Sequence, residues 1–311
     1  MDENLKQQLQ SLCAGALFNE PLSRYTTVRI GGPADSLVYP KTIDEVAAVA
    51  KLCRANDLPL LVLGAGSNLL VRDKGIRGVV MSLSQGFGKI EVERQEKDEV
   101  IVYAEAGVGL PRLVDYAAEE GFGGLEVLSG IPGNVGGALV MNAGTQDGDI
   151  SQSVLNVTFL EPHKKGDVPI KTWDKKDIEY SYRESHFPRA AVILSARFSL
   201  RPLSSEKIRG KIQKYRDYRL QTQPLNVPSL GSVFKNPAGK KLFAAKLIEE
   251  TGLKDVRVGG ARISAKHANW IVNEGGATAR DVLALIGLVK DKVKEKFGVN
   301  LETEVRVVGE E

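Results

Sequence analysis

The sequence predicts an α+β chain in two parts, roughly residues 1–203 and 204–311. Helical and extended patterns alternate through the first 200 residues, and the segment Arg201–Ser205 then breaks an extended run. No apolar run approaches the ~20 residues of a membrane-spanning helix, and no repeat of solenoid period is present. A chain of 311 residues, 42% hydrophobic and 26% charged, is long enough to bury about three quarters of its unfolded surface without disulfides or a structural metal.

Charge and cysteine usage narrow the class of protein. A formal net charge of +3 is too small to predict a nucleic-acid or membrane-surface partner. Cys13 and Cys53 stand among apolar neighbours, as buried thiols in a reducing compartment do. The apolar stretch Leu12–Phe18 lacks a basic leader and a cleavage site, so we expect no signal peptide and a cytoplasmic protein. No metal-ligand spacing is present and we expect no metal. The histidines stand far apart, at His163, His186 and His267.

The elements of the first part follow from capping residues and apolar spacing. Thr42 and Glu45 form a capping box before apolar residues at helical spacing, which predicts a helix over Thr42–Ala55. Proline at its start and glycine just past its end predict a second helix over Pro111–Glu120. Short apolar runs predict strands over Leu58–Leu63, Val79–Leu83, Val92–Glu96, Val100–Ala104, Val154–Glu161 and Ala191–Leu200.

The second part is predicted to form three helices and a closing strand. The helices are expected over Glu206–Leu220, Lys240–Thr251 and Thr278–Phe297, and the last of them ends before a glycine. Its apolar face consists of Val282, Leu285, Ile286, Val289 and Val293. The strand is expected over Leu301–Val308, where alternation puts the charged residues on one face and the apolar residues on the other.

Three glycine-rich segments carry the functional signal: Arg29–Ala34, Leu63–Leu70 and Ser129–Gly144. Glycine permits positive φ angles and close approach of a ligand to the backbone, and successive N–H groups in such turns form concave nests for phosphate oxygens. Each segment taken alone is most simply a tight turn. Three of them in one part of the chain, each beside apolar strand-like residues, favour a nucleotide-type ligand.

Two common nucleotide-binding patterns do not fit this chain. Gly64-x-Gly66-x-x-Leu69 lacks the third glycine of the Rossmann fingerprint, and no helical pattern follows it. The Walker A pattern is absent as well. Both fingerprints therefore fail in this sequence.

Longer motifs make the chain recognisable. Gly64–Leu70 and Ser129–Gly137 resemble the FAD-binding domain of the vanillyl-alcohol-oxidase/PCMH flavoprotein superfamily. Tyr182–Ser185, Gly231–Pro237 and Leu301–Arg306 are similar to the UDP-N-acetylenolpyruvoylglucosamine reductase (UDP-N-acetylmuramate dehydrogenase) family, and the similarity runs in order from about Phe18 to Gly309. From Arg183 to Ser232 there is no room for the tyrosine-bearing loop of the longer type, so the chain resembles the shorter type.

This resemblance implies a fold and an activity. The fold would be a two-subdomain PCMH-type FAD-binding region, residues 1–84 and 85–203, followed by a smaller α+β substrate-binding domain, residues 204–311. The activity would be NADPH-dependent reduction of the enolpyruvyl ether of UDP-N-acetylglucosamine-enolpyruvate to UDP-N-acetylmuramate, through non-covalent FAD, in cytoplasmic peptidoglycan precursor synthesis. We expect a monomer whose partner is this small-molecule substrate, with no nucleic acid and no membrane.

The resemblance also assigns the residues of the site. Ser232 would donate the proton to C2, and Arg183 and Glu304 would act at the enolate. Judged without the resemblance, these are a turn serine, a surface arginine and part of a solvated strand face. The cofactor residues would be Arg29, Gly64, Gly66, Ser67, Asn68, Gly133, Gly137, Asn142 and Gly144. The substrate residues would be Tyr182, Lys235, Asn236 and Arg306. Arg219 either meets substrate phosphate or lies on a solvated helix end.

Two other functions remain open at this point. Besides the reductase that the motifs suggest, the chain could be another PCMH-type FAD oxidase or dehydrogenase. It could also be a nucleotide-binding regulator without turnover. No His or Cys suited to covalent flavin attachment stands near the glycine segments, which disfavours the other oxidase or dehydrogenase.

Overall fold

The computed structural model describes residues 1–161, 168–188, 190–238 and 242–311. Helices and strands are mixed throughout, and the predicted α+β class is confirmed. Contacts divide the chain into two compact units. Unit 1 comprises Met1–Phe18, Asp35–Ala65 and Gly78–Asp217, and unit 2 comprises Asn19–Ala34, Gly66–Arg77 and Tyr218–Glu311. The division into 1–84, 85–203 and 204–311 stays a prediction.

Helix α2 (Ile43–Ala55) shows how the sequence determines the first elements of unit 1. The Thr42 side chain accepts the Glu45 N–H at 3.2 Å, and Val46, Val49, Ala50 and Cys53 are buried. The Thr42 N-cap is therefore confirmed, whereas the Glu45 carboxylate accepts the Lys41 N–H at 2.7 Å rather than closing the predicted box. Helix α1 (Glu3–Leu12) precedes it, with Asp2 as N-cap. A four-stranded sheet of order β1-β2-β5-β3 contains Leu17–Pro21, Pro33–Val38, Ile76–Met81 and Leu60–Val62.

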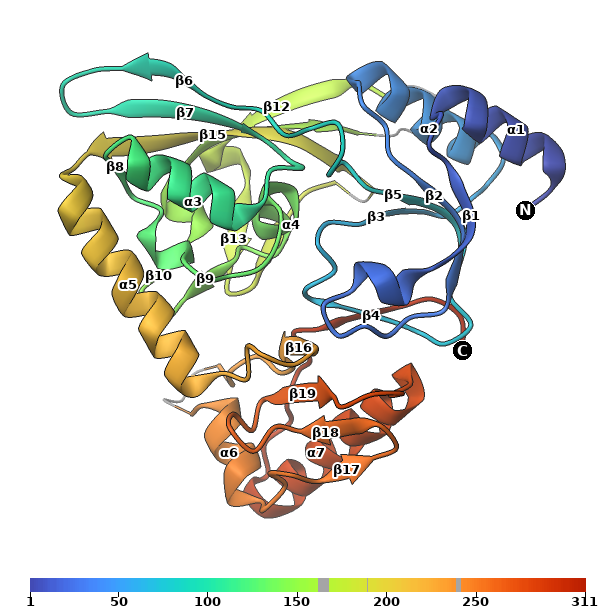
Figure 1. The fold of residues 1–311 in the computed structure, drawn as a ribbon, viewed down its shortest axis with the longest axis vertical. Coiled ribbons are helices and arrows are strands. Elements are labelled where there is room, and N and C mark those ends of the chain that lie inside the picture. Colours follow the sequence, from blue (N-terminus) through green and yellow to red (C-terminus); the bar gives the residue numbers. More distant parts are fainter. Residues whose placement is uncertain (162–167, 189, 239–241) are drawn as a thin grey trace. The chain divides into compact units, whose positions relative to one another are not determined.

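The larger sheet of unit 1 has the order β12-β11-β15-β7-β6, with β8 paired to β15. The strands predicted from the apolar runs form two antiparallel pairs in this sheet, β6 with β7 and β11 with β15. In Figure 1, β6, β7 and β15 lie side by side with α3 beneath them. The strands are Ile90–Gln95 (β6), Val100–Glu105 (β7), Phe122–Gly123 (β8), Val154–Leu160 (β11), Ile170–Asp174 (β12) and Val192–Pro202 (β15).

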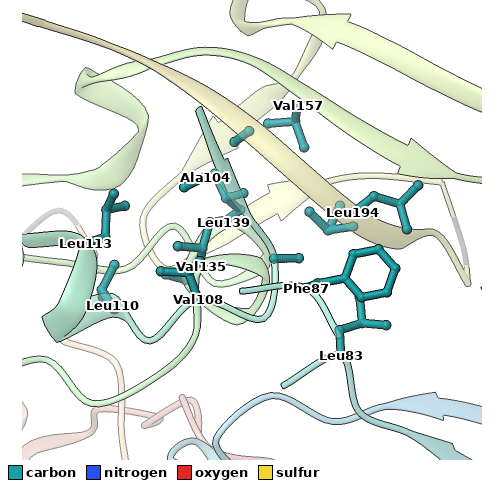
Figure 2. Packing of buried hydrophobic residues seen from close by; sticks show 14 of the residues in the cluster. Leu83, Phe87, Ala104, Val108, Leu110, Leu113, Val135, Leu139, Val157 and Leu194 are labelled. Atoms are coloured by element: carbon teal, nitrogen blue, oxygen red, sulfur yellow. The ribbon is translucent and has the colours of Figure 1, made fainter. Parts of the chain in front are cut away.

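The core of unit 1 joins this sheet to the third glycine-rich segment. Helix α3 (Leu110–Glu119) and the short helix α4 (Val135–Val140) contribute buried Leu113, Val135 and Leu139 to one apolar cluster. Figure 2 shows Val135 and Leu139 beside Val108 and Ala104. The glycine-rich segment is thereby anchored by its own apolar residues.

Unit 2 is built on a four-stranded sheet of order β16-β19-β18-β17, against which α7 packs (Figure 1). The strands are Ser229–Ser232 (β16), Trp270–Asn273 (β19), Ala261–Ile263 (β18) and Arg257–Val258 (β17). Helix α7 (Ala279–Phe297) has the predicted apolar face, a capping box between Thr278 and Asp281, and Gly298 at its end. A second, parallel pair joins β20 (Arg306–Val308) to β4 (Leu69–Val71).

Some predicted bounds were wrong. Helix α6 spans only Ala244–Glu250, and the predicted start at Lys240 lies outside the described residues. The closing strand is regular only over Arg306–Val308, because residues 302–305 pair irregularly with residues 233–235 instead. Helix α5 (Ser205–Thr222) begins one residue before the predicted start at Glu206 and ends two residues past the predicted end at Leu220, and the division between the units falls within it. The remaining short elements are Leu22–Tyr25, Glu126–Leu128, Gly144–Thr145 (β9), Gly148–Asp149 (β10), Ile150–Gln152, Lys175–Asp177, Glu179–Ser181 (β13) and Glu184–His186 (β14).

Candidate functional site

In unit 1 the third glycine-rich segment packs backbone to backbone against Ala106–Leu110. The Leu110 N–H donates to the Gly133 carbonyl at 2.8 Å, and the Gly136 N–H donates to the Ala106 carbonyl at 2.9 Å. A Cβ on Gly136 would lie 3.0 Å from the Ala106 Cβ, a contact that would force Ala106 to shift by a few tenths of an ångström. Glycine therefore favours the close packing here.

Other glycines of the same region leave the backbone open. An added Cβ at Gly109 or Gly137 would meet no atom within 4 Å, and one at Gly64 would meet only the Asn134 side chain, at 3.6 Å. Backbone without a Cβ is the surface that a planar ring can approach closely. These open positions fit a flavin. The two remaining predicted glycines of this unit are Gly133, at a φ of 151°, and Gly144, which lies in β9 against β10.

Arg183 lies at the tip of a two-residue hairpin between β13 and β14. Its φ is 61°, an uncommon angle for a non-glycine residue, and such strain clusters at functional sites. The guanidinium lies over the Tyr182 ring at 4.9 Å, a cation–π contact, and Tyr182 is 48% exposed. Both side chains thus stand at the tip of one turn.

The hairpin is fastened to the glycine-rich segment. The Ser185 hydroxyl is within hydrogen-bond distance of the Leu139 and Val140 carbonyls, at 2.8 and 2.9 Å. The Asn142 amide donates to the Ser181 carbonyl at 2.9 Å, and Asn142 is 2% exposed. In unit 1, therefore, Asn142 fixes the hairpin that carries Arg183.

In unit 2 the residues that follow Ala65 form a tight turn. Gly66 has a φ of 62°, its carbonyl accepts the Thr27 N–H at 3.3 Å, and a Cβ would lie 2.1 Å from the Tyr25 carbonyl oxygen. Only glycine fits this position. Ser67 and Asn68 follow it directly. Arg29 is exposed and has a φ of 56°.

Ser232 and Glu304 belong to hydrogen-bonded segments of unit 2. Strand β16 bulges between Ser229 and Ser232 as it pairs with β19, and the Glu304 N–H donates to the Val233 carbonyl at 2.8 Å. Asn68 completes the arrangement, because its amide donates to the Glu304 carbonyl at 3.0 Å. Residues far apart in sequence are thus brought together around Glu304.

The predicted substrate residues of unit 2 have varied surroundings. Lys235 Nζ lies 3.8 Å from Glu302. The Asn236 side chain accepts the Ala244 N–H at 3.0 Å, at the start of α6. Arg306 is exposed at the start of β20, and its N–H donates to the Asn68 carbonyl at 3.1 Å. Arg219 is half-buried and its Nε has no hydrogen-bond partner; burial lowers its pKa from the usual value.

Some site features escaped the sequence analysis. The segment Ala106–Leu110 was missed, although Gly107 and Gly109 were a visible signal. Asn134, whose amide donates to the Gly107 carbonyl at 2.6 Å, lay inside a motif without being singled out. Among the described residues, no group of three or more His, Cys, Asp and Glu side chains is arranged to hold a metal ion, and His163 lies outside them. No helix in the described ranges is long and apolar enough to cross a membrane.

Comparison with known families agrees with this geometry. Residues 34–166 match the family model described as FAD binding domain. Residues 223–308 match the model described as UDP-N-acetylenolpyruvoylglucosamine reductase, C-terminal domain. By class, the chain is an FAD-dependent oxidoreductase.

Similar proteins define the family more closely. A UDP-N-acetylenolpyruvoylglucosamine reductase of Clostridium botulinum (strain 657 / Type Ba4) is 44% identical over 95% of this chain and 93% of its own length. One of Bacillus pumilus is 42% identical over 99% of both chains. The crystal structure of the reductase from Thermus caldophilus superposes with a TM-score of 0.78 at 36% identity, over 94% of this chain and 97% of that one. The chain belongs to the UDP-N-acetylenolpyruvoylglucosamine reductase family.

Proposed function

We propose that this protein reduces the enolpyruvyl ether of UDP-N-acetylglucosamine-enolpyruvate to the lactyl ether of UDP-N-acetylmuramate, with NADPH as hydride donor. The observation that carries the proposal is the pairing in unit 2 of the Ser232 segment with the Glu304 segment. A hydroxyl and a carboxylate on hydrogen-bonded segments suit a reaction that must add a proton beside a developing negative charge.

The flavin is proposed to be held by glycine-rich backbone. In unit 1 the residues would be Gly64, Gly133, Gly137, Asn142 and Gly144, and in unit 2 they would be Arg29, Gly66, Ser67 and Asn68. When bound, FAD supplies the acceptor and donor of a hydride. The open backbone at Gly64 and Gly137 supports this role in unit 1. Asn142 contributes there by fixing the Arg183 hairpin, since its side chain is turned to the Ser181 carbonyl.

The main demand on the protein is to stabilise charge. Addition of a hydride at C3 of an enolpyruvyl carboxylate builds an enolate, with negative oxygens crowded into a small region. Arg183 would neutralise this charge with a planar guanidinium that can make two parallel hydrogen bonds. The strained turn and the cation–π contact with Tyr182 restrict the guanidinium to fewer conformations before substrate binds.

Ser232 would deliver the proton to C2. A serine hydroxyl is a weak acid, so its proton transfer needs neighbours that stabilise the alkoxide or return the proton. Glu304 would polarise the substrate or relay the proton. Lys235 and Asn236 would assist from the segment that follows Ser232, and Arg306 and Tyr182 would contact substrate. Arg219, with its unpartnered Nε, would meet substrate phosphate.

The biological setting follows from this chemistry. UDP-N-acetylmuramate is a peptidoglycan precursor, so the proposed role is in bacterial cell-wall synthesis in the cytoplasm. We also propose that the protein acts as a monomer on its small-molecule substrate.

The test is an oxidation assay with purified, FAD-loaded protein. NADPH consumption is expected to depend on UDP-N-acetylglucosamine-enolpyruvate, and mass spectrometry is expected to show a product heavier than the substrate by two hydrogens. Consumption of NADPH at the same rate without this substrate, or an unchanged substrate mass, would refute the proposal.

A further inference from the structure

Asn269 is a buried side chain whose amide bonds to the backbone beside Ser232. Its Oδ1 accepts the Phe234 N–H at 2.9 Å, and its Nδ2 donates to the Phe234 carbonyl at 2.8 Å. Its own carbonyl accepts the Val233 N–H at 2.9 Å. Asn269 is 5% exposed, so these three hydrogen bonds are shielded from water.

The residues that Asn269 holds are also those that hold Glu304. The Val233 carbonyl accepts the Glu304 N–H at 2.8 Å, Phe234 forms a bridge with Thr303, and the Lys235 N–H donates to the Glu302 carbonyl at 2.9 Å. Residues 233–234 thus have Asn269 as partner on one side and the Glu304 segment on the other. A shift of residues 233–234 would disturb the placement of Ser232, which directly precedes them, relative to Glu304, which bonds to Val233.

The side-chain amide of Asn269 makes the hydrogen bonds to Phe234 that the backbone of a neighbouring strand would otherwise make. Strand β16 pairs with β19 at Ser229 with Val272 and at Ser232 with Trp270, with a bulge between these pairs. The regular pairing ends at Ser232. Beyond it, the Asn269 side chain satisfies both the N–H and the carbonyl of Phe234, as a paired strand would. Without this side chain, both buried groups would lose their partners.

We propose that Asn269 is a positioning residue that fixes the placement of the Ser232 hydroxyl relative to the Glu304 carboxylate. The inference rests on the proposed function, in which these two side chains act on the enolpyruvyl group. The surroundings of Asn269 are apolar, since the core cluster of unit 2 includes buried Ala268, Ile271, Val233 and Phe234. A fully satisfied polar network in such surroundings gives a defined geometry that apolar packing alone does not give.

The first experiment compares Asn269→Ala with Thr278→Ala in stopped-flow kinetics of the FAD-loaded protein. Thr278 is the matched control, because its hydroxyl also accepts a backbone N–H, that of Asp281 at 3.1 Å, at the start of α7 in the same unit. Misplacement of reacting groups by about 1 Å can cost ~100-fold. We therefore expect Asn269→Ala to slow flavin reoxidation by the enolpyruvyl substrate about 10- to 100-fold. Flavin reduction by NADPH should stay near the wild-type rate, and Thr278→Ala should change neither step.

Hydrogen exchange gives a readout that does not depend on activity. In Asn269→Ala, peptides covering residues 230–236 and 302–306 are expected to exchange faster than in wild type. In Thr278→Ala, faster exchange is expected at the start of α7 instead. Equal slowing of both half-reactions in Asn269→Ala, or unchanged exchange at 302–306, would overturn the assignment.

Asn269→Asp keeps the proposal testable if the alanine variant does not fold. A protonated carboxyl can supply the one donor and the one acceptor that the amide uses toward Phe234, whereas the ionised form loses the donor and repels the Phe234 carbonyl. The reoxidation rate relative to wild type should therefore fall as the pH rises between about 5.5 and 8.5, around the raised pKa expected of a buried carboxyl. His267 Nδ1 accepts the Asn269 N–H in the native structure, so both proteins are compared in a His267→Gln background, which removes this titration from the ratio. A relative rate that rises with pH would contradict the proposal.

The two proposals fail in different ways. If wild-type protein takes hydride from NADPH but is not reoxidised by the enolpyruvyl substrate, the proposed function is wrong. If wild type is reoxidised and Asn269→Ala is reoxidised equally fast, only the role of Asn269 is wrong.

Discussion

In unit 1 the Ser129–Gly144 segment packs directly against the backbone of Ala106–Leu110, whereas in unit 2 the Ser232–Phe234 segment is held between Asn269 and the residues around Glu304. The packing in unit 1 depends on the absence of a side chain, since a Cβ at Gly136 would press on Ala106. The arrangement in unit 2 depends on polar groups, each of which has a specific hydrogen-bond partner. Substitutions should therefore affect the two regions in opposite ways, by adding atoms in unit 1 and by removing polar groups in unit 2.

The largest effect is expected for Ser232→Ala in unit 2. Loss of a general acid costs between about 10²- and 10⁴-fold. NADPH should still bleach the flavin, and reoxidation by the enolpyruvyl substrate should slow by that factor. Stopped-flow absorbance of the flavin measures both steps. Fast reoxidation in this variant would show that Ser232 is not the proton donor.

A smaller effect is expected for Glu304→Gln in the same region. The amide keeps the shape of the side chain but not its charge, so we expect reoxidation to slow about 10- to 100-fold. Reduction by NADPH should change little. The backbone contacts of Glu304 to Val233 and Asn68 do not involve the carboxyl group, so folding should be preserved. Equal slowing of the two half-reactions would count against the assignment of Glu304.

Local sequence patterns predicted the elements whose stabilising contacts are close in sequence. Helix α7 is an example, because Thr278 and Asp281 cap each other three residues apart and its apolar face repeats at helical spacing. The glycine-rich segments were found for a similar reason, since a requirement for glycine is visible at single positions. Neither depends on knowing the fold.

The arrangement around Ser232 could not be predicted in this way. Asn269 and Phe234 are 35 positions apart, and Asn68 and Glu304 are 236 positions apart. No periodicity or motif connects such pairs, and the resemblance supplied the roles of Ser232 and Glu304 without their supports. The Arg183 hairpin was missed as an element because its strands are short and polar, with no apolar alternation to mark them.

In unit 1 the informative change is Gly137→Ala, with Gly210→Ala as its matched control. Both glycines lie in helices, and an added Cβ meets nothing within 4 Å at either. Alanine favours helix over glycine by about 0.5–1 kcal/mol, so both variants should unfold at slightly higher urea concentration. Only Gly137→Ala should weaken FAD binding, by about tenfold or more, if the open backbone of α4 faces the flavin.

Fluorescence titration of the apoprotein with FAD measures this difference. Gly210→Ala should bind FAD as wild type does, because Gly210 lies in the middle of α5, away from the glycine-rich segments in sequence. Equal FAD affinity in both variants would remove Gly137 from the cofactor site. Weaker binding in both would point to an indirect effect of helix stability.

The smallest effect concerns the stability of unit 2 and its pH dependence. Burial lowers the pKa of His267, with a further lowering by the charge of Lys254; a hydrogen bond from its own backbone and the charge of Glu249 act in the other direction without reversing the shift. The unfolded chain therefore binds a proton at His267 below about pH 6.5, where the folded protein resists it. Stability should fall as the pH drops below that value, by at most about 1.4 kcal/mol per pH unit from this residue. In His267→Gln this contribution to the slope should disappear. Urea unfolding between about pH 5 and 8, the range in which an ordinary histidine titrates, measures the difference in stability between the two proteins.

Alkylation of Cys13 and Cys53 serves as the control, because these thiols report on unit 1 in the same experiment. Both thiols are buried there, and burial raises their pKa to about 11 and about 12, so they should react with alkylating reagents only when unit 1 opens. If lowering the pH increased thiol labelling and left the His267→Gln slope unchanged, the acid-sensitive region would be unit 1.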